Sequence, residues 1–589
     1  MKKRTAATAF LPAKLEQGRA WGLAVNLYTL RSKRNWGIGD FTDLRGFVRL
    51  ALALGADFVG VNPLHALHYN DPGAASPYSP TSRFFLNPIY IDVEAVPEFD
   101  HDDPRAAALR GRVGSAQFAE ALAALRETPL VEYVRVARAK WSALEELYGA
   151  FRLRRGARAA AFRDFCEAGG PRLERFAVYE ALGERFARAR SGANGWPSWP
   201  AEYQDVRSEA VKAFAARNRR RVNYFKYLQW IADEQLAAAA NAGSEMSIGL
   251  YRDVAVGVAP DSADVWSDRS AYVLDETVGA PPDPLGPLGQ NWGLPPPVPS
   301  AMLGGGAASF AELLRSNMRH AGALRLDHAM ALTRLFRIPQ GRPASEGAYV
   351  AYPFDELLAI VEAESVRARC VVVGEDLGNV PEGFRERMER ERILSYRLLL
   401  FEREFDGAFK SPEAYPRLAL ATGTTHDLPT LPGWALGRDI EARVRIGLLP
   451  AETAARARAE RRVDASRLID ALARHGELDR ESFQRLHAAI DARSAEPASY
   501  APLVSAAYRY LADTPARLIL VPLDDALCTF DQVNLPGTSG EYPNWRRKLA
   551  PGLDGIAVDV LVEAIAAQVR ARVTQEPDRH SAQREEVST

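Results

Sequence analysis

Eight short runs of apolar and β-branched residues recur along the chain, and polar residues follow most of them at once. Uninterrupted apolar runs of this length are typical of parallel strands that are buried on both faces. Helix-like segments lie between several of the runs, for example at residues 41–54 and 310–320. This alternation predicts an α/β fold, the (β/α)8 TIM barrel, although a doubly wound open sheet would produce similar local patterns. The runs lie at residues 23–27, 58–62, 248–256, 323–327, 370–375, 396–402, 418–422 and 518–523.

The spacing between the runs is uneven, which indicates large insertions in the barrel. The longest interval separates the second and third runs, and its apolar residues recur every three or four positions, as in amphipathic helices. A second helical segment, rich in Ala and Arg, precedes the last run. We therefore assign the barrel to residues 1–75, 247–435 and 511–575, and two mainly helical insertions to residues 76–246 and 436–510.

Two further segments have the composition of irregular structure. Residues 279–299 carry many Pro and Gly residues around Trp292, so we expect a long loop there and neither a regular helix nor a central strand. Long loops in compact domains are often functional. The tail at residues 576–589 is polar, and we expect it to be disordered.

Composition and charge exclude several classes of partner and compartment. Lys plus Arg is 74 and Asp plus Glu is 75, so the formal net charge is -1. Nucleic acids and anionic membranes select a strong basic excess, and we expect neither as a partner. The three cysteines, Cys166, Cys370 and Cys528, are far apart without CxxC spacing, which disfavours disulfides and zinc and fits a reducing compartment. No signal peptide or apolar stretch of membrane-spanning length occurs, so a cytoplasmic protein is predicted.

Three of the predicted strands lead into carboxylates, in the segments ALRLDHAM, VVVGEDLG and ATGTTHDLP. In a barrel, reactive groups gather at the C-terminal ends of the strands. Arg325 and Asp327 are two positions apart and point to one face of a strand, where the arginine favours a charged, nucleophilic carboxylate. Glu375 ends an apolar strand, where desolvation would raise its pKa towards that of a general acid. Asp427 precedes a turn that contains Pro429.

Each segment taken alone also has an ordinary structural explanation: an ion pair for Asp327, a cap for Glu375 and a turn for Asp427. Together they match the requirements of glycosidic bond cleavage, which needs one carboxylic acid and a second carboxylate that attacks or activates water. A third carboxylate can hold sugar hydroxyls and keep the acid protonated. The chain has no GxSxG, Walker or HExxH motif. The chemistry requires neither a metal nor an organic cofactor, and we expect none.

The motifs RLDH, GEDLG and THD, in this order, resemble those of the amylomaltases or 4-alpha-glucanotransferases, glycoside hydrolase family 77 of the alpha-amylase clan. Further matching segments follow the same order and extend over most of the chain. They are NWGIGDFTDL at 35–44, SPYSPTSRFFLNP at 76–88, FKYLQWIADEQL at 225–236, IGLYRDVAVGVAPDSADVW at 248–266, GQNWG at 289–293 and NLPGTSGEYPNWRRKL at 534–549. One departure is GTTHDLPTLPGW, where several relatives read GTHDNDTTxGW, so the residues after Asp427 differ.

The resemblance implies a retaining double displacement on alpha-1,4-glucans, which serve as both donor and acceptor. Asp327 is then the nucleophile, Glu375 the acid/base and Asp427 the third carboxylate. The substrate-binding residues that it implies are Arg325, His328, His426, Tyr78, Asp253, Gln290, Trp292 and Asp376, with the segment around Gln290 and Trp292 as a loop over the bound glucan. The preference for transfer rests on this resemblance. A plain alpha-glucan hydrolase and a noncatalytic glucan-binding barrel stay open on the residues alone.

Overall fold

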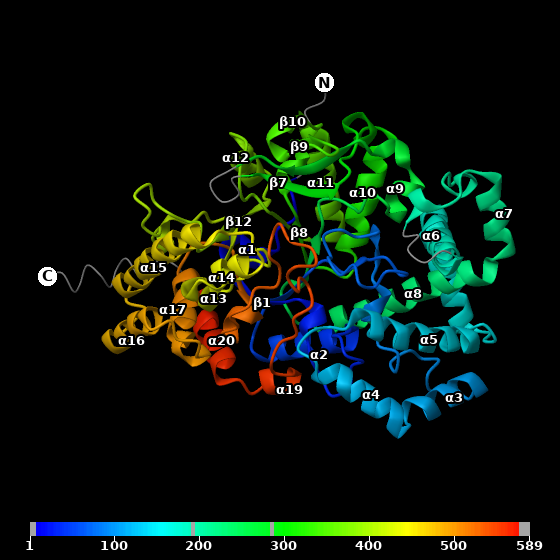
Figure 1. Cartoon of the computed structure of the whole chain (residues 1–589), viewed down its shortest axis with the longest axis horizontal. Helices are drawn as coiled ribbons and strands as arrows, with labels where there is room; N and C mark the ends of the chain where they lie inside the picture. Colours follow the sequence, from blue (N-terminus) through cyan, green and yellow to red (C-terminus); the bar gives the residue numbers. More distant parts are fainter. Residues whose placement is uncertain (1–7, 190–194, 283–287, 576–589) are drawn as a thin grey trace.

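The computed structural model describes residues 8–189, 195–282 and 288–575 (Figure 1). It confirms the predicted barrel, because eight strands pair in parallel and close on themselves in the order β1-β14-β13-β12-β11-β8-β5-β2. Each strand overlaps one of the eight apolar runs. The strands are β1 (Ala20–Val25), β2 (Phe58–Val61), β5 (Gly249–Val254), β8 (Ala323–Leu326), β11 (Val371–Gly374), β12 (Leu394–Leu398), β13 (Ala419–Thr422) and β14 (Leu518–Pro522).

The strands are short and buried on both faces, which is why their sequences read as uninterrupted apolar runs. All four residues of β8, of β11 and of β13 are buried. Side chains such as Phe58, Val371 and Leu420 belong to one buried cluster contributed by all eight strands. Helices cover the outside of the barrel: α2 (Phe41–Ala53), α10 (Gly305–Met318), α11 (Phe354–Ala368), α12 (Phe384–Arg390), α17 (Ala501–Ala512) and α20 (Val560–Val573). Short helices lie around this shell: α18 (Leu523–Ala526) beside β1 and β14, and α19 (Leu553–Ile556) beside α2. Leu15 of α1 (Ala13–Gln17) joins the cluster inside the barrel, and α9 (Ala263–Ser267) packs on the segment between β2 and β5.

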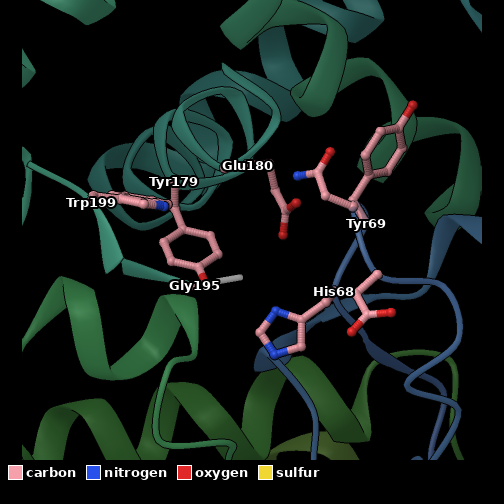
Figure 2. A pocket seen from close by; sticks show the side chains of 9 residues that line it. His68, Tyr69, Tyr179, Glu180, Gly195 and Trp199 are labelled. Atoms are coloured by element: carbon pink, nitrogen blue, oxygen red, sulfur yellow. The ribbon is translucent and has the colours of Figure 1, made fainter. Parts of the chain in front are cut away.

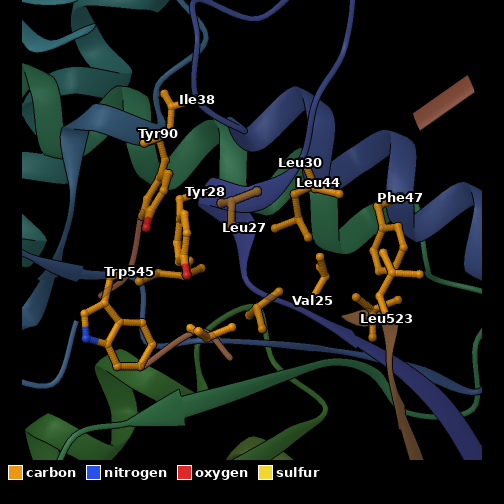
Figure 3. Close-up of a cluster of buried hydrophobic side chains, with 14 of the residues drawn as sticks. Val25, Leu27, Tyr28, Leu30, Ile38, Leu44, Phe47, Tyr90, Leu523 and Trp545 are labelled. Atoms are coloured by element: carbon orange, nitrogen blue, oxygen red, sulfur yellow. The ribbon is translucent and has the colours of Figure 1, made fainter. Parts of the chain in front are cut away.

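Helix α2 shows how a family motif can be structural. Asp40 accepts hydrogen bonds from the backbone of Thr42 and Asp43, and Asp43 bonds back to the Asp40 backbone, which is a capping box. Arg34 pairs with Asp40 at 2.7 Å. The segment NWGIGDFTDL therefore begins the first helix of the barrel. Figure 3 shows the core that this helix covers, where Leu44 and Phe47 of α2 lie with Val25 of β1 and Leu523 of α18.

Helices also fill the two longest intervals between barrel strands. Between β2 and β5 lie the antiparallel pair β3 (His65–Ala66) and β4 (Ser82–Leu86) and then α3 (Pro104–Val113), α4 (Ala116–Glu127), α5 (Tyr133–Phe151), α6 (Ala157–Ala189), α7 (Glu209–Arg217) and α8 (Arg219–Asn241). Between β13 and β14 lie α13 (Leu431–Leu436), α14 (Arg438–Arg445), α15 (Ala451–Arg474), α16 (Arg480–Asp491) and α17. In Figure 1, α6 and α7 project on one side of the barrel and α15 and α16 on the other. The domain boundaries themselves stay predictions.

The prediction of an irregular loop at residues 279–299 was wrong in part. The segment contains β7 (Gln290–Leu294) and the end of β6 (Glu276–Ala280). With β9 (Arg334–Pro339) and β10 (Ala348–Ala351) these strands form an antiparallel sheet in the order β10-β9-β6-β7. Gly279 permits this because a Cβ there would lie 2.0 Å from the carbonyl oxygen of Gln290. The prolines stand outside the strands, so they do not interrupt the pairing.

Two further sequence predictions concern the C-terminal tail and membrane-spanning segments. The tail at 576–589, predicted to be disordered, lies outside them. Within them, no helix is long and apolar enough to cross a membrane.

Candidate active site

The predicted catalytic residues lie at the C-terminal ends of neighbouring barrel strands. Asp253 is the penultimate residue of β5 and pairs in register with Arg325 of β8. Asp327 follows the last residue of β8, and Glu375 follows the last residue of β11. Because β5, β8 and β11 are adjacent in the barrel, their ends present these side chains to one another.

Arg325 is the centre of this group. Its guanidinium donates two hydrogen bonds to Asp253, at 2.9 and 2.8 Å, and lies 2.9 Å from Asp327 and 3.8 Å from Glu375. Burial alone would lower the pKa of Arg325, but the three carboxylates raise it well above its ordinary value. One permanent positive charge therefore stands among three acidic side chains, in a region where solvent screens little.

Glu375 lies in a position suited to holding a proton near neutral pH. Backbone N–H groups of His328 and Leu377 donate to its two oxygens at 2.9 and 2.7 Å. Burial raises the pKa of Glu375 to about 7; Arg325 and the two backbone bonds oppose this shift, and the charge of Asp327 adds to it. The side chains of Glu375 and Asp327 are 11% and 16% exposed, so Asp327 is somewhat more open to solvent.

His328 links the carboxylates to the antiparallel sheet. Its backbone has φ 47°, in the left-handed region, and this conformation directs the backbone N–H at Glu375. Burial lowers the pKa of His328 to about 4, so the ring is neutral at physiological pH. The Trp292 ring packs edge-on against it with centroids 5.1 Å apart, and the Trp292 indole N–H donates to Gln290 at 3.0 Å. The hairpin β6–β7 thus brings both predicted residues to the site.

A group of aromatic side chains lies beside the carboxylates, and its first member, Tyr78, comes from the loop between β3 and β4. The Tyr78 hydroxyl donates to Asp253 at 2.6 Å and lies 3.1 Å from Nδ1 of His426. The Tyr78 and His426 rings stack with centroids 4.4 Å apart. Trp545 lies against both rings at 5.4 Å. These contacts make an aromatic wall beside the carboxylates.

Asp427 is held differently from the other two catalytic candidates. Its side chain is 50% exposed, with Nε2 of His426 at 3.4 Å and the Asn534 amide donating at 2.7 Å. Partial burial raises the pKa of Asp427, but His426 and the hydrogen bond from Asn534 lower it by more, so the carboxylate keeps its charge. For His426 the signs are opposite: burial lowers its pKa, but the neighbouring Asp427 raises it by more, so the pKa of His426 lies above its ordinary value.

Asp376, which was predicted to bind substrate, is bonded to other groups of the protein in this structure, and its role in binding stays a prediction. Its side chain is 4% exposed and accepts hydrogen bonds from Ser395 at 2.6 Å, from the Tyr396 backbone at 2.8 Å and from Arg385 at 2.8 Å. These partners connect the end of β11 to β12 and to α12. Asp376 is adjacent to Glu375 in sequence, but its carboxylate oxygens already accept hydrogen bonds from other residues of the protein.

Asn534 and Trp545 belong to the site although neither was predicted from the sequence. Both lie in the segment that follows the C-terminal end of β14, which is another barrel strand. Their signal was the motif NLPGTSGEYPNWRRKL, in which an amide and an aromatic side chain follow the last strand. Only the folded chain shows which residues of that motif reach His426 and Asp427.

Two other polar places in the described part of the chain are poor candidates for this chemistry. A cavity of about 20 Å³ beside α6 is lined by side chains that include His68, Glu180 and Trp199 (Figure 2), and it is too small for a sugar ring. The ligand atoms of His475, Glu477 and Asp513 lie within 4.8 Å of one another, as in a metal site. Arg572 pairs with both of these carboxylates, at 2.6 and 2.7 Å, which favours an ion-pair network there.

The C-terminal face of the closed barrel thus carries several carboxylates, and a pair of carboxylates is what barrel enzymes that act on glycosidic bonds use. Comparison with known proteins agrees, because a model of the family described as 4-alpha-glucanotransferase matches residues 25–554. The chain therefore belongs to the 4-alpha-glucanotransferase family, and its enzyme class is that of a glucanotransferase.

Individual relatives cover nearly the whole chain. It is 39% identical over 571 residues to a 4-alpha-glucanotransferase of Haemophilus influenzae, covering 95% of this chain and 80% of the relative. It is 38% identical over 586 residues to a 4-alpha-glucanotransferase of Mycobacterium tuberculosis, covering 96% and 76%.

Solved structures support the same fold. The amylomaltase of Corynebacterium glutamicum superposes with a TM-score of 0.82 at 32% identity, covering 95% of this chain and 77% of that one. The amylomaltase of Streptococcus agalactiae in complex with acarbose has a TM-score of 0.72 at 18% identity, covering 95% and 100%, and this likeness concerns the fold alone.

Proposed function

We propose that the chain transfers a segment of a 1,4-alpha-D-glucan to the 4-hydroxyl of an acceptor glucan or glucose by a retaining double displacement. The observation that carries the proposal is the Arg325 cluster, in which Asp327 pairs with the guanidinium while the pKa of Glu375 is raised to about 7. A charged nucleophile beside a protonated acid is the arrangement that this reaction needs.

In the first step, a carboxylate oxygen of Asp327 attacks the anomeric carbon of the donor glucan. The bond from that carbon to the glycosidic oxygen breaks, and Glu375 gives its proton to the departing oxygen. The shortened glucan leaves with a free 4-hydroxyl. A glucosyl ester on Asp327 and an ionised Glu375 are the products of this step.

In the second step, the 4-hydroxyl of the acceptor attacks the same carbon from the opposite side. Glu375 takes the hydroxyl proton, Asp327 leaves as a carboxylate, and a new alpha-1,4 bond forms. Two inversions retain the alpha configuration and return both side chains to their starting states. In retaining enzymes the two carboxyl groups are about 5–5.5 Å apart, which is the separation we expect for Asp327 and Glu375 in the complex.

The neighbouring residues are proposed to bind and distort the donor sugar. Tyr78 and His426 would line the donor subsite, with the aromatic face against the sugar ring, and Asp427 would accept hydrogen bonds from its hydroxyls. Asp253 keeps Arg325 and Tyr78 in place through the bonds described above. Trp292 and Gln290, on the β6–β7 hairpin, would cover the bound glucan and exclude water, which favours transfer over hydrolysis.

Incubation with maltotriose as the only sugar tests the proposal against simple hydrolysis. We expect a ladder of longer maltooligosaccharides together with free glucose, resolved by chromatography over time. Shortening of the substrate without longer products would show a hydrolase. A purified chain that binds maltotriose but leaves it unchanged would show a glucan-binding protein without transferase activity.

A further inference from the structure

The loop that carries His426 and Asp427 spans residues 423–430, between β13 and α13, and we call it the β13–α13 loop. Asp427 stands five residues beyond the end of β13, so strand geometry does not place it. Its position depends on what holds the two ends of the loop. Those ends meet a buried pair of side chains, Asp525 and Tyr508, that the proposed chemistry does not use.

Asp525 directly follows Asp524 in α18 and is fully buried. One of its oxygens accepts a hydrogen bond from the backbone N–H of Leu431 at 2.7 Å, at the C-terminal end of the loop. The other accepts from the hydroxyl of Tyr508 at 2.5 Å. Tyr508 is also fully buried, in α17. Both oxygens of Asp525 are therefore engaged, one by the loop and one by a helix.

The same pair packs against the other end of the loop. A Cβ on Gly423 would lie 2.6 Å from the Tyr508 hydroxyl and 3.1 Å from an oxygen of Asp525. The loop backbone thus passes directly over the pair, at an approach that only glycine permits. The Asp525–Tyr508 pair touches both the first residue of the loop and the residue after its last.

Two further contacts tie the loop to the segment after β14. The Thr430 hydroxyl donates to the backbone oxygen of Thr529, and Asn534 donates to Asp427 at 2.7 Å. Within the loop, the Thr424 hydroxyl donates to the Pro429 carbonyl at 2.8 Å, and this bond joins the two ends of the loop. Of these contacts, the one through Asp525 is the most deeply buried.

We infer that Asp525 and Tyr508 are positioning residues, which hold the β13–α13 loop so that His426 and Asp427 meet the donor sugar in the reactive geometry. The inference rests on the proposed function of the site. A buried carboxylate that loses a partner is left unsatisfied, and the loop would shift to restore a bond. Misplacement of a catalytic group by about 1 Å can cost about a hundredfold in rate.

Tyr508→Phe and Asp525→Ala test the inference, because the first removes only the hydroxyl and the second removes both acceptor oxygens, whereas an asparagine could still bond both partners. We expect kcat/KM for maltotriose to fall by roughly tenfold to a hundredfold in each variant. Most of the loss should be in kcat, since distortion of the donor sugar acts in the transition state. Thermal unfolding and circular dichroism are measured in parallel to show that the variants are folded.

The chain offers a matched control in Tyr227 and Glu98. The Tyr227 hydroxyl donates to Glu98 at 2.8 Å, and both side chains are fully buried, in the interval between β2 and β5. Tyr227→Phe should lower the unfolding temperature much as Tyr508→Phe does, yet leave kcat/KM within about twofold of wild type. An equal loss of kcat/KM in both phenylalanine variants would overturn the inference in favour of general stability.

A double-mutant cycle with His426→Ala supplies the second readout. If the pair acts through the loop, Tyr508→Phe should cost less in the His426→Ala background than in the wild type, because only Asp427 is then left for the loop to misplace. The same fold-loss in both backgrounds would contradict the inference. Asp427→Asn separates this outcome from a failure of the proposed function. Low activity of Asp427→Asn with normal activity of Tyr508→Phe and Asp525→Ala refutes only the positioning role. Wild-type activity of Asp427→Asn refutes the function assigned to the loop.

Discussion

The two halves of the candidate site are built in different ways. Asp327 and Glu375 each follow the last residue of a barrel strand, are largely buried and share one guanidinium. Asp427 lies five residues beyond β13, is half exposed and depends on side chains from other segments. The strand-anchored half is fixed by the backbone of the barrel, whereas the loop half is fixed by tertiary contacts. We therefore expect substitutions in the strand-anchored half to abolish most of the activity, and substitutions in the loop half to reduce it by smaller, graded amounts.

The largest effect is predicted for Asp327→Asn, which removes the proposed nucleophile while keeping the shape of the side chain. Turnover of maltotriose should fall by at least about 10⁴-fold, as for nucleophiles in other covalent mechanisms. The initial rate of glucose release measures this. Wild-type turnover in this variant would remove the basis for the assignment of the whole strand-anchored half.

Glu375→Gln should cost about 10²–10⁴-fold, the usual range for loss of a general acid. A donor with a fluoride leaving group needs no protonation, so alpha-maltosyl fluoride should restore the first step. A first step, measured as fluoride release in a single turnover, that is no faster with this donor than the cleavage of maltotriose would show that Glu375 has another role.

The pH profile sharpens the same point. Because burial raises the pKa of Glu375 to about 7, and the first step requires its protonated form, kcat/KM should fall as pH rises through about 7. The limb should be absent in Glu375→Gln acting on alpha-maltosyl fluoride. A wild-type profile that stays flat from pH 6 to well above pH 8 would argue against Glu375 as the acid.

A smaller effect is predicted in the loop half for Asn534→Ala. Loss of one hydrogen bond to a half-exposed carboxylate costs about 1–2 kcal/mol, so kcat/KM should fall by about fivefold to thirtyfold. Steady-state kinetics with maltotriose measures it, with Asn218→Ala at the junction of α7 and α8 as a control away from the site. A loss as large as that of Glu375→Gln would show that the loop half is no more tolerant than the strand half.

The smallest catalytic effect is predicted for Asp376→Asn. Its carboxylate connects β11 to β12, so the change should destabilise the fold by about 1–3 kcal/mol while leaving kcat/KM within about threefold of wild type. Chemical denaturation and maltotriose kinetics on the same sample separate the two outcomes. A large loss of kcat/KM without loss of stability would show that Asp376 is a substrate-binding residue.

The strand half of the site could be predicted from sequence because its residues obey a local rule. A carboxylate directly after an apolar run must lie at a strand end, and barrel topology then brings neighbouring ends together. Asn534 and Trp545 obey no such rule, since folded loops bring them to Asp427 and His426, respectively, from a distant part of the chain. The β6–β7 hairpin was missed because Pro and Gly dominate its composition, although the glycine sits where the strands approach closely and the prolines lie outside them.

The most direct test of the central claim is to trap the glucosyl ester on Asp327. In Glu375→Gln supplied with alpha-maltosyl fluoride, the first step proceeds without an acid while the second lacks its base, so the intermediate should accumulate. Mass spectrometry of the proteolysed enzyme should then find one added maltosyl group on the peptide that contains Asp327, absent from the Asp327→Asn double variant. Fluoride release with no adduct on that peptide, or an adduct on Asp427 instead, would contradict the account.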